Sequence, residues 1–527
     1  MILQRTDCPE QLLKCLRFSQ QNDGHALALT DNVSCGVLRQ HVSIRRGHVE
    51  VRVSEHYGLG RTQAELDFVD VDIQSDTAVF VSPRALGMLP SRWGDECVAL
   101  VQSFFQAVME AIRGGDHGRA ETLLRALREP NETHLGLSSA QSQGRGLGDG
   151  SAHSVWSALR TSEAARSGLL QDLEDTILLI PGVSSDIISD MTTNIIREPL
   201  IHYTQAMCAQ YEIPLIGDVA SGPLWDPREK KWGDKYVQLP IAAGNKLLLV
   251  PKAIVRQKPD YDAGEYYRHF LLEHLRAVEI EENTALVRLL RNGQKRVTKK
   301  DLMAKYGTGK EAIVRETIRY PRALADYRRS KQGRLPQPMS SEALSEVEGQ
   351  PGPNWDQLVE AVIGTPVGQE GATRYEKAIE ALFTALFYPS LTNPIFQFEM
   401  HEGRKRVDVT YTNMGLRGFF LWLSTHYPSS HVFIECKNYG REIANPELDQ
   451  LSGRFSPSRG QVGMLVCRSF QDKQRFLRRC KDTAADHRGF VIALDDEDLQ
   501  QLVEYRKREP LYDAWPLLRS RFKDLIA

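Results

Sequence analysis

The sequence lacks the features that would indicate a small secreted protein or a membrane protein. Its 527 residues include eight cysteines, none of them in a CxxC pair, so it indicates neither a zinc cluster nor a disulfide framework. No stretch approaches the ~18 apolar residues of a membrane span, and no basic segment followed by an apolar run opens the chain. We therefore expect a cytoplasmic protein with reduced thiols and no membrane contact.

The chain also lacks a large excess of charge of either sign. A formal net charge of −2 excludes strong attraction of the whole molecule to DNA, but it leaves local basic surfaces possible. Hydrophobic residues make up 41% and charged residues 25% of the chain, a balance typical of compact globular domains. How the charge is distributed should therefore matter more than its sum.

Changes of pattern along the chain predict its domain organisation. Alternating apolar and polar residues over 33–81 predict a small sheet, and helical spacing over 96–128 predicts helices packed on it. Repeated Pro, Gly, Ser and Glu after residue 335 predict a linker. We therefore expect four parts: an α+β domain over 1–130, a mainly helical domain over 131–335, a linker over 336–370 and an α/β domain over 371–527.

Positive charge is concentrated in residues 295–334, which hold thirteen basic and four acidic residues. Two helical segments here flank the turn at 306–309 and resemble a helix-turn-helix. The stretch is either a contact with the DNA backbone or a pair of solvated amphipathic helices, and both interpretations stay open. The candidate DNA contacts are Lys299, Lys300, Lys305, Lys310 and Arg315.

Because Glu311 follows Lys310, the phosphate-binding pattern GxxxxGK[ST] fails and no ATPase is indicated.

The C-terminal part can be divided into elements from its periodicity. A helix is expected over 374–387, followed by the strands IFQFEM, RVDVTY and HVFIECK. A helix in PELDQLSGRF, a buried strand QVGMLVC, a helix over 471–485, a strand GFVIAL and a last helix from Asp495 complete the order. This order predicts an α/β fold with a mixed sheet and helices on both faces.

Three charged residues lie on these expected strands. Side chains alternate along a strand, so Glu435 and Lys437 share one face, and Asp408 joins them if its strand is a neighbour. Burying such a group is costly unless its members pair or hold a metal. Asp408, Glu435 and the backbone carbonyl of Cys436 offer the hard oxygen ligands that suit Mg²⁺, with Mn²⁺ as an alternative. Lys437 would orient the attacking water or stabilise the transition state.

The alternative interpretation is purely structural: Glu435 and Lys437 would form an exposed ion pair on a sheet without catalytic function. The residues themselves, VD at 407–408 and ECKNY at 435–439, resemble the PD-(D/E)xK nuclease superfamily and especially its Mrr-type restriction branch. The resemblance covers roughly the last 155 residues. Val407 stands where the motif has Pro, and the spacing of the two strands implies an insertion between them.

The resemblance implies further members of the site and a restriction-endonuclease-like fold. The helix before the strands would supply Glu376, with Glu380 as its substitute, and the helix after the third strand would supply Gln450. Together with Asp408, Glu435 and Lys437, these residues would form the catalytic set. The preceding region looks similar to uncharacterised bacterial proteins in which it precedes a nuclease domain.

The sequence therefore predicts a metal-dependent DNA endonuclease, an effector of bacterial antiphage defence or restriction. Foreign duplex DNA is the expected partner, and the chain is expected to form a homo-oligomer or to act with other defence proteins. The N-terminal region would sense a target or regulate the cut. Two alternatives remain: a structure-selective repair or recombination nuclease, and a non-catalytic DNA-binding regulator that uses the basic stretch.

Overall fold

The computed structural model of the chain contains both helices and strands, and it describes residues 44–45, 48–49, 51–136, 155, 157–332, 337–400, 404–510 and 512–527. The chain divides into two compact units, Met1–Ile44 and Arg45–Ala527. The elements named below belong to the second unit. None of the helices that the structure describes combines the length and apolar composition required to cross a membrane.

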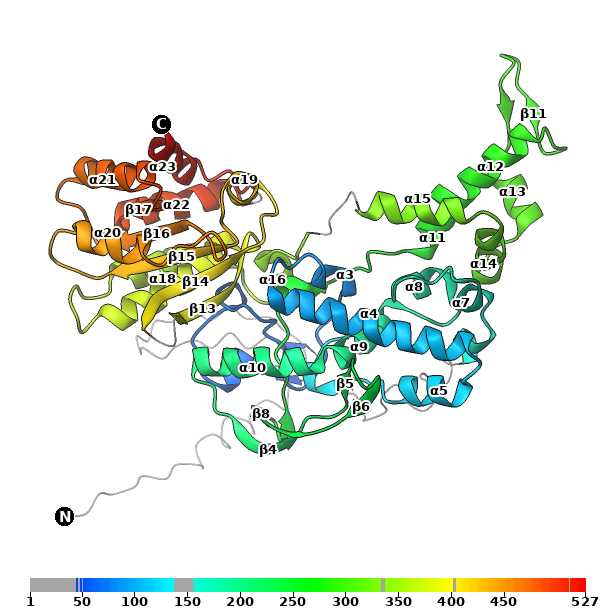
Figure 1. The fold of residues 1–527 in the computed structure, drawn as a ribbon, viewed down its shortest axis with the longest axis horizontal. Helices are drawn as coiled ribbons and strands as arrows, with labels where there is room; N and C mark the ends of the chain where they lie inside the picture. The colour runs from blue at the N-terminus through cyan, green and yellow to red at the C-terminus, as the bar shows by residue number, and fades with distance from the viewer. Residues whose placement is uncertain are drawn as a thin grey trace, which may run out of the picture. The chain divides into compact units, whose positions relative to one another are not determined.

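A five-stranded mixed sheet dominates the C-terminal part (Figure 1). Its strands follow the chain in the order β13 (Leu391–Met400), β14 (Lys405–Asn413), β15 (His431–Lys437), β16 (Val462–Cys467) and β17 (Phe490–Leu494). The first three strands pair antiparallel, and β15, β16 and β17 pair parallel. The parallel strands are apolar throughout their centres because both of their faces are covered.

Helices cover both faces of this sheet. The faces of β15 show this, since Phe433 lies against Phe455, which follows α20, whereas Cys436 lies near Tyr375 on α18. The helices of this part are α17 (Trp355–Ile363), α18 (Ala372–Phe387), α19 (Gly418–His426), α20 (Asn445–Ser452), α21 (Lys473–Ala485), α22 (Asp496–Arg508) and α23 (Pro516–Ile526). The predicted α/β class and the order of the predicted elements are therefore confirmed, with α19 and α23 as additional helices.

Residues 53–344 contribute to one hydrophobic core, which residues from both predicted N-terminal domains share. Its helices are α2 (Val53–His56), α3 (Pro83–Leu86), α4 (Arg92–Arg113), α5 (His117–Arg125), α7 (Glu163–Ser167), α8 (Asp175–Leu179), α9 (Ser185–Ile195), α10 (Arg197–Tyr211), α11 (Ala263–Tyr266), α12 (Leu272–Glu281), α13 (Lys299–Tyr306), α14 (Lys310–Arg319), α15 (Pro321–Gln332) and α16 (Ser341–Val347). The short strands of this part of the chain are β3 (Phe80–Val81), β4 (Ile216–Ala220), β5 (Leu224–Asp226), β6 (Lys231–Gly233), β7 (Tyr236–Leu239), β8 (Ile241–Ala242), β9 (Asn245–Lys246), β10 (Val255–Arg256), β11 (Arg288–Leu289) and β12 (Lys295–Arg296). Helical spacing over 96–128 correctly predicted α4 and α5.

The small sheet expected over 33–81 is confirmed only in part, because β1 (Ile44–Arg45) and β2 (His48–Val49) pair as a two-stranded sheet, whereas the described residues after them do not continue it. Between residues 51 and 81 the chain forms α2, a 3₁₀ turn at Gln63–Glu65 and β3, which pairs with the distant β10. Residues 33–43 lie outside the described residues. The alternation was real, but buried side chains rather than a neighbouring strand satisfy much of the local backbone.

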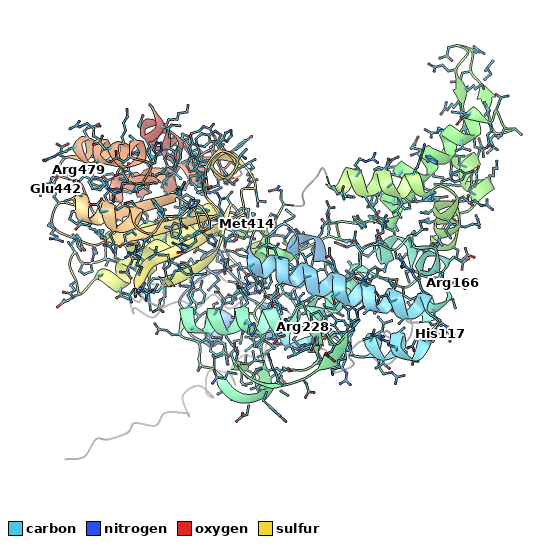
Figure 2. The ribbon with its side chains drawn as sticks, in the orientation of Figure 1. His117, Arg166, Arg228, Met414, Glu442 and Arg479 are labelled. Carbon is cyan, nitrogen blue, oxygen red and sulfur yellow. The ribbon has the colours of Figure 1, made fainter. Side chains whose placement is uncertain are left out.

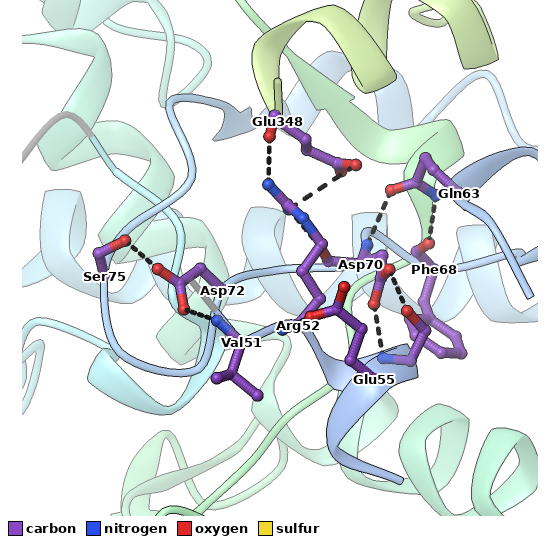
Figure 3. A network of polar contacts seen from close by, with 10 residues as sticks. Val51, Arg52, Glu55, Gln63, Phe68, Asp70, Asp72, Ser75 and Glu348 are labelled. Carbon is purple, nitrogen blue, oxygen red and sulfur yellow. Dashed lines mark hydrogen bonds and ion pairs between the residues drawn. The ribbon is translucent and has the colours of Figure 1, made fainter. Parts of the chain in front are cut away.

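Figure 3 shows this network of polar side chains. The Arg52 guanidinium donates to the carbonyl oxygens of Asp70, at 2.9 Å, and of Glu348. The Gln63 side chain donates to the Phe68 carbonyl and accepts the Asp70 N–H, both at 2.8 Å. Side chains thus satisfy several backbone groups of this segment without a β-ladder.

Glu348 belongs to the segment expected to be a linker, and this segment is packed. Leu344 on α16 lies in the N-terminal core, whereas Leu358 and Val362 on α17 lie in the C-terminal core. Met414, just after β14, is buried in the N-terminal core (Figure 2). Pro, Gly and Ser were therefore compatible with two short helices whose apolar residues face different cores.

Candidate active site

The site begins where β14 and β15 separate. Their ladder ends at the pair Val409 and Ile434, so the next residues, Asp408 and Glu435, lie side by side beyond the last paired position. The Cys436 N–H donates to Oδ2 of Asp408 at 2.7 Å instead of to a strand partner. On its other side, β15 remains paired with β16 as far as Lys437. One strand edge therefore opens while the other stays fixed.

Glu435 uses its two carboxylate oxygens differently. Its Oε1 accepts from Lys437 Nζ at 2.7 Å and from Gln450 Nε2 at 2.6 Å. Its Oε2 is buried and has no hydrogen-bond donor among the described residues. The residue is only 1% exposed. A buried carboxylate oxygen without a donor is costly in an apolar setting, so this oxygen is the strongest sign of a missing ligand.

The charges of the site act on one another. Burial raises the pKa of Asp408, although the Cys436 N–H and the Lys437 ammonium oppose this. Burial, followed by repulsion from Asp408, also raises the pKa of Glu435 against the effect of Lys437. For Lys437, burial alone would lower the pKa, but the Glu435 and Asp408 carboxylates outweigh it and raise it. The Lys437 ammonium therefore holds its proton more tightly than usual, and the Asp408 and Glu435 carboxyl groups lose theirs less easily than usual.

Glu376 on α18 belongs to the same electrostatic cluster. Burial and the nearby Asp408 raise its pKa to about 7, and Glu435 contributes. Gln397 on β13 donates a hydrogen bond of 2.7 Å to Glu376 Oε2. Glu380, the substitute considered from sequence, is instead buried in an ion pair with Arg61 at 2.6 Å. The structure therefore brings Glu376, and not Glu380, to the four predicted residues on the strands and α20.

The oxygen donors fit a hard divalent cation. Asp408 and the free Oε2 of Glu435 are adjacent anionic oxygens, which Mg²⁺ prefers over nitrogen or sulfur ligands. Among the described residues, no three His, Cys, Asp or Glu side chains form a ready-made metal cluster. A main-chain oxygen and water would have to complete the coordination, as expected for Mg²⁺, which usually keeps several waters.

Two arginines near the site were not singled out from the sequence. Arg406 and Arg454 both lower the pKa of Asp408, and Arg454 Nε donates to the Arg406 carbonyl at 3.1 Å. Arg406 lies two residues before Asp408, so both side chains leave the same strand face. Arg454 follows Gln450 by four positions and lies two residues after the end of α20. These two spacings were readable signals for cations beside the carboxylates.

The end of the ECKNY segment has a structural function. Asn438 is 4% exposed, and its Nδ2 donates to the carbonyl oxygens of Pro366 at 2.8 Å and Gly368 at 3.0 Å. The Gly368 N–H in turn donates to the Asn438 carbonyl at 2.9 Å. This double connection holds the chain before α18 beside the end of β15, and so it positions Glu376 relative to Glu435.

The five predicted DNA contacts do not form one free surface. Lys299 pairs with Glu273 at 3.1 Å, Lys305 pairs with the buried Glu279, and Arg315 pairs with Glu316 at 2.7 Å. Lys310 points inward and donates to the carbonyl oxygens of Ile180 and Val183. Lys300 is exposed and has no ion-pair partner among the residues that the structure describes. The helices around the 306–309 turn are present, but most of their predicted contacts already have intramolecular partners.

Comparison with known proteins adds one match. Residues 58–262 match a family described as a domain of unknown function (DUF8370). No curated protein and no solved structure matches the chain significantly. The match covers much of the N-terminal core and ends before the basic stretch and the candidate site.

Proposed function

We propose that this chain is a metal-dependent endonuclease of the PD-(D/E)xK type that hydrolyses DNA phosphodiester bonds. The observation that carries the proposal is the buried Oε2 of Glu435, unpaired among the described residues, beside Asp408 and the Lys437 ammonium. The restriction-endonuclease-like fold is part of the same proposal. The helix, antiparallel strands and parallel strands described above support it, together with the position of the carboxylates where two strands separate.

Each residue has a task in the proposed reaction. Asp408, Glu435 and the Cys436 carbonyl would hold Mg²⁺ or Mn²⁺, which when bound lowers the pKa of water and neutralises charge on the phosphate. Lys437 orients the attacking water and stabilises negative charge on the phosphoryl oxygens. Gln450 donates a hydrogen bond to Oε1 of Glu435, the oxygen that is not assigned to the metal. Arg406 and Arg454 are placed to attract the DNA backbone to the site.

Cleavage of supercoiled plasmid by the full chain, with Mg²⁺ or Mn²⁺ and with EDTA, tests the proposal. We expect nicked and linear products only with metal, and a loss of at least about 100-fold in Glu435→Ala and Lys437→Ala. The exposed residues Glu497 and Lys481 supply matched controls, Glu497→Ala and Lys481→Ala. If the site variants cut as fast as these controls, the assignment of the site is wrong.

The cellular setting is proposed as bacterial antiphage defence or restriction, with foreign duplex DNA as substrate. Its support is the combination of a nuclease-like site with a large N-terminal core that could sense a target or regulate cutting. Phage plating on cells that express the wild-type chain or Glu435→Ala tests it. Equal plating on both strains, together with preferential cutting of branched DNA, would favour a repair nuclease instead.

A further inference from the structure

A β-hairpin rises between α12 and α13 (Figure 1). Its strands β11 and β12 pair antiparallel, with Arg288 opposite Arg296 and Leu289 opposite Lys295. The turn is closed by hydrogen bonds of 2.9 Å from Leu290 N–H to the Gln294 carbonyl and from Gly293 N–H to the Leu290 carbonyl. Gly293 has φ 79°, a left-handed conformation that suits glycine at such a turn. The hairpin is thus a defined element.

The base of the hairpin is attached to the N-terminal core. Val297 is 2% exposed, and Leu286 and Val287 pack against the same core. The Thr284 hydroxyl donates to the buried carboxylate of Glu279. The outer part is in solvent, where Leu289 is 72% exposed. The fold therefore presents the hairpin side chains outward from an anchored base.

The charge of this element is of one sign. From Asn283 to Lys300 the chain has six basic residues and no acidic residue, and four of the six are on the hairpin: Arg288, Arg291, Lys295 and Arg296. Of these four hairpin residues, Arg288 alone has a carboxylate partner among the residues that the structure describes. It pairs with Asp301 at 3.3 Å, and the Arg288 side chain is still 70% exposed. This contrasts with Lys299, Lys305 and Arg315, which are paired.

The strand register of the hairpin places like charges opposite each other, which is unfavourable when no anion lies between them. Like charges directly opposite each other on one face of an antiparallel pair destabilise it. Arg288 and Arg296 are such a pair, and Arg291 adds a third guanidinium at the turn. An anion with several oxygens between them would remove the repulsion. Guanidinium groups bind phosphate with two parallel N–H donors, which a compact ammonium cannot do.

We infer that the β11–β12 hairpin is the main contact of this chain with duplex DNA, with Arg288 and Arg296 on one backbone and Arg291 at the tip. Duplex DNA presents about one phosphate charge per 1.7 Å of its axis, so neighbouring phosphates match closely spaced cations. The exposed Leu289 on the opposite face gives the hairpin an apolar contact for a groove wall. The inference deepens the proposed nuclease function by naming where its substrate is held.

Binding of a fluorescein-labelled 30-base-pair duplex to the full chain in EDTA tests this inference without cleavage. The variant R288A/R291A/K295A/R296A is compared with R228A/K230A/K231A/K235A (Arg228, Figure 2), which removes the same charge from a region whose three lysines are paired with carboxylates. We expect about 10-fold or greater loss of affinity at 150 mM salt in the hairpin variant and less than about 2-fold in the control. The salt dependence of log Kd should become shallower by about 3 to 4, near 0.9 for each lost phosphate contact.

Equal affinity of the hairpin variant and the wild type, or equal loss in the charge-matched control, would overturn the inference. Circular dichroism and thermal melting check the fold of each variant. If the quadruple variant does not fold, R291A/K295A, which leaves the opposed arginine pair intact, should still weaken binding about 3- to 10-fold. Displacement of the duplex by poly-glutamate more readily than by unlabelled DNA would assign the hairpin to an acidic protein and also overturn it.

The outcomes separate this inference from the nuclease proposal. Hairpin-dependent DNA binding without cutting under any divalent metal would leave the hairpin assignment intact and reject the nuclease. Metal-dependent cutting with unchanged DNA binding by the hairpin variant would support the nuclease proposal and reject the hairpin as the main DNA contact.

Discussion

The Glu435 carboxylate is divided between two tasks. Its Oε1 accepts from Lys437 and Gln450, whereas Oε2 has no donor in the described part of the chain. The first oxygen therefore fixes the orientation of the side chain, and the second remains for a ligand. This division makes metal binding measurable separately from cleavage.

Glu435→Gln should weaken Mn²⁺ binding at least about 10-fold, because the amide keeps the size of the side chain but loses the anionic oxygen. Isothermal titration with Mn²⁺ on the EDTA-treated, dialysed chain measures this. Glu497→Gln, an exposed change of the same kind, should bind as the wild type does. Unchanged affinity in Glu435→Gln would remove this residue from the metal site.

Gln450 should contribute less to the rate of cleavage than Lys437. A hydrogen bond to a charged group contributes about 1.5–3 kcal/mol, so Gln450→Ala should slow cleavage about 10- to 100-fold. In the proposed reaction Lys437→Ala removes a charge beside the phosphate, so it should slow cleavage about 100- to 1000-fold. Single-turnover cleavage at saturating metal measures both, with Gln474→Ala on α21 as the control for Gln450. Equal effects of the two site variants would contradict the separate tasks.

The pKa of Glu376, about 7, predicts a pH dependence in the neutral range. Deprotonation adds a negative charge beside Asp408 and Glu435, which strengthens attraction for a divalent cation. Metal affinity should therefore rise between about pH 6 and pH 8. In Glu376→Gln the rise across this window should flatten. An unchanged profile in that variant would assign the titration to another group.

The same carboxyl group predicts a stability change with the opposite direction. A folded-state pKa raised from 4.5 to about 7 means that the folded chain binds the proton more tightly than the unfolded chain. Its contribution is full below the unfolded pKa and is lost as pH rises through the folded pKa. Partial exposure of Glu376 reduces the effect through solvent screening, to about 1–2 kcal/mol. Because other buried carboxyl groups such as Asp190 also have raised pKa values, urea unfolding in EDTA at pH 5 to pH 8 should show a larger loss in the wild type than in Glu376→Gln.

At the scale of elements, the separation of β14 from β15 depends on its surroundings. β15 is held on its other side by β16, and the segment before α18 is tied to its end by Asn438. The helix α19 accounts for the expected insertion between β14 and β15. These contacts let one strand pair open at the carboxylates without loss of the sheet.

Asn438→Ala should lower the free energy of unfolding by about 1–3 kcal/mol, because two carbonyl oxygens lose their donors in a buried setting. Denaturant unfolding measures the change, and the exposed Asn445 at the start of α20 provides a control, Asn445→Ala. A midpoint identical to that of the control would mean that the two hydrogen bonds contribute nothing to stability.

At the scale of the whole molecule, buried charges join residues of the two hydrophobic cores. Arg61 pairs with Glu380 on α18, and Asp67 accepts the Asn393 N–H at 2.9 Å. Lys252 lies over the Tyr388 ring at 4.1 Å from its centroid. The region that matches the domain of unknown function thus contacts the helix that also carries Glu376.

Arg61→Ala should destabilise the chain by about 3–5 kcal/mol, since it leaves the Glu380 carboxylate buried without its cation. Replacing both partners, as Arg61→Met with Glu380→Leu, should recover a large part of this loss. Thermal and denaturant unfolding of both variants measure it. A double variant less stable than Arg61→Ala would show that the pair itself stabilises the fold beyond removal of the unpaired charge.

The sequence by itself determined most elements of the C-terminal part, and it predicted the residues of the candidate site. Strand alternation, helical spacing and turn residues act over a few positions, so β13 to β17 and their helices could be predicted. The i,i+2 spacing of Glu435 and Lys437 likewise required only a strand. The additional α23 and the arginines Arg406 and Arg454 had local signals that were not used.

Only the tertiary structure decided which charged and polar groups have partners. Glu376 and Glu380 lie one turn apart on the same helix, so the sequence does not distinguish their roles. Arg61, which is distant in sequence, forms an ion pair with Glu380. Residues 51–81 alternate like strands, yet the side chains of Arg52 and Gln63 satisfy part of that backbone instead. Lys305 and Lys310 looked available for DNA until Glu279 and two carbonyl oxygens were found beside them. Burial and pairing depend on contacts between distant residues, and a pattern of neighbouring residues does not contain them.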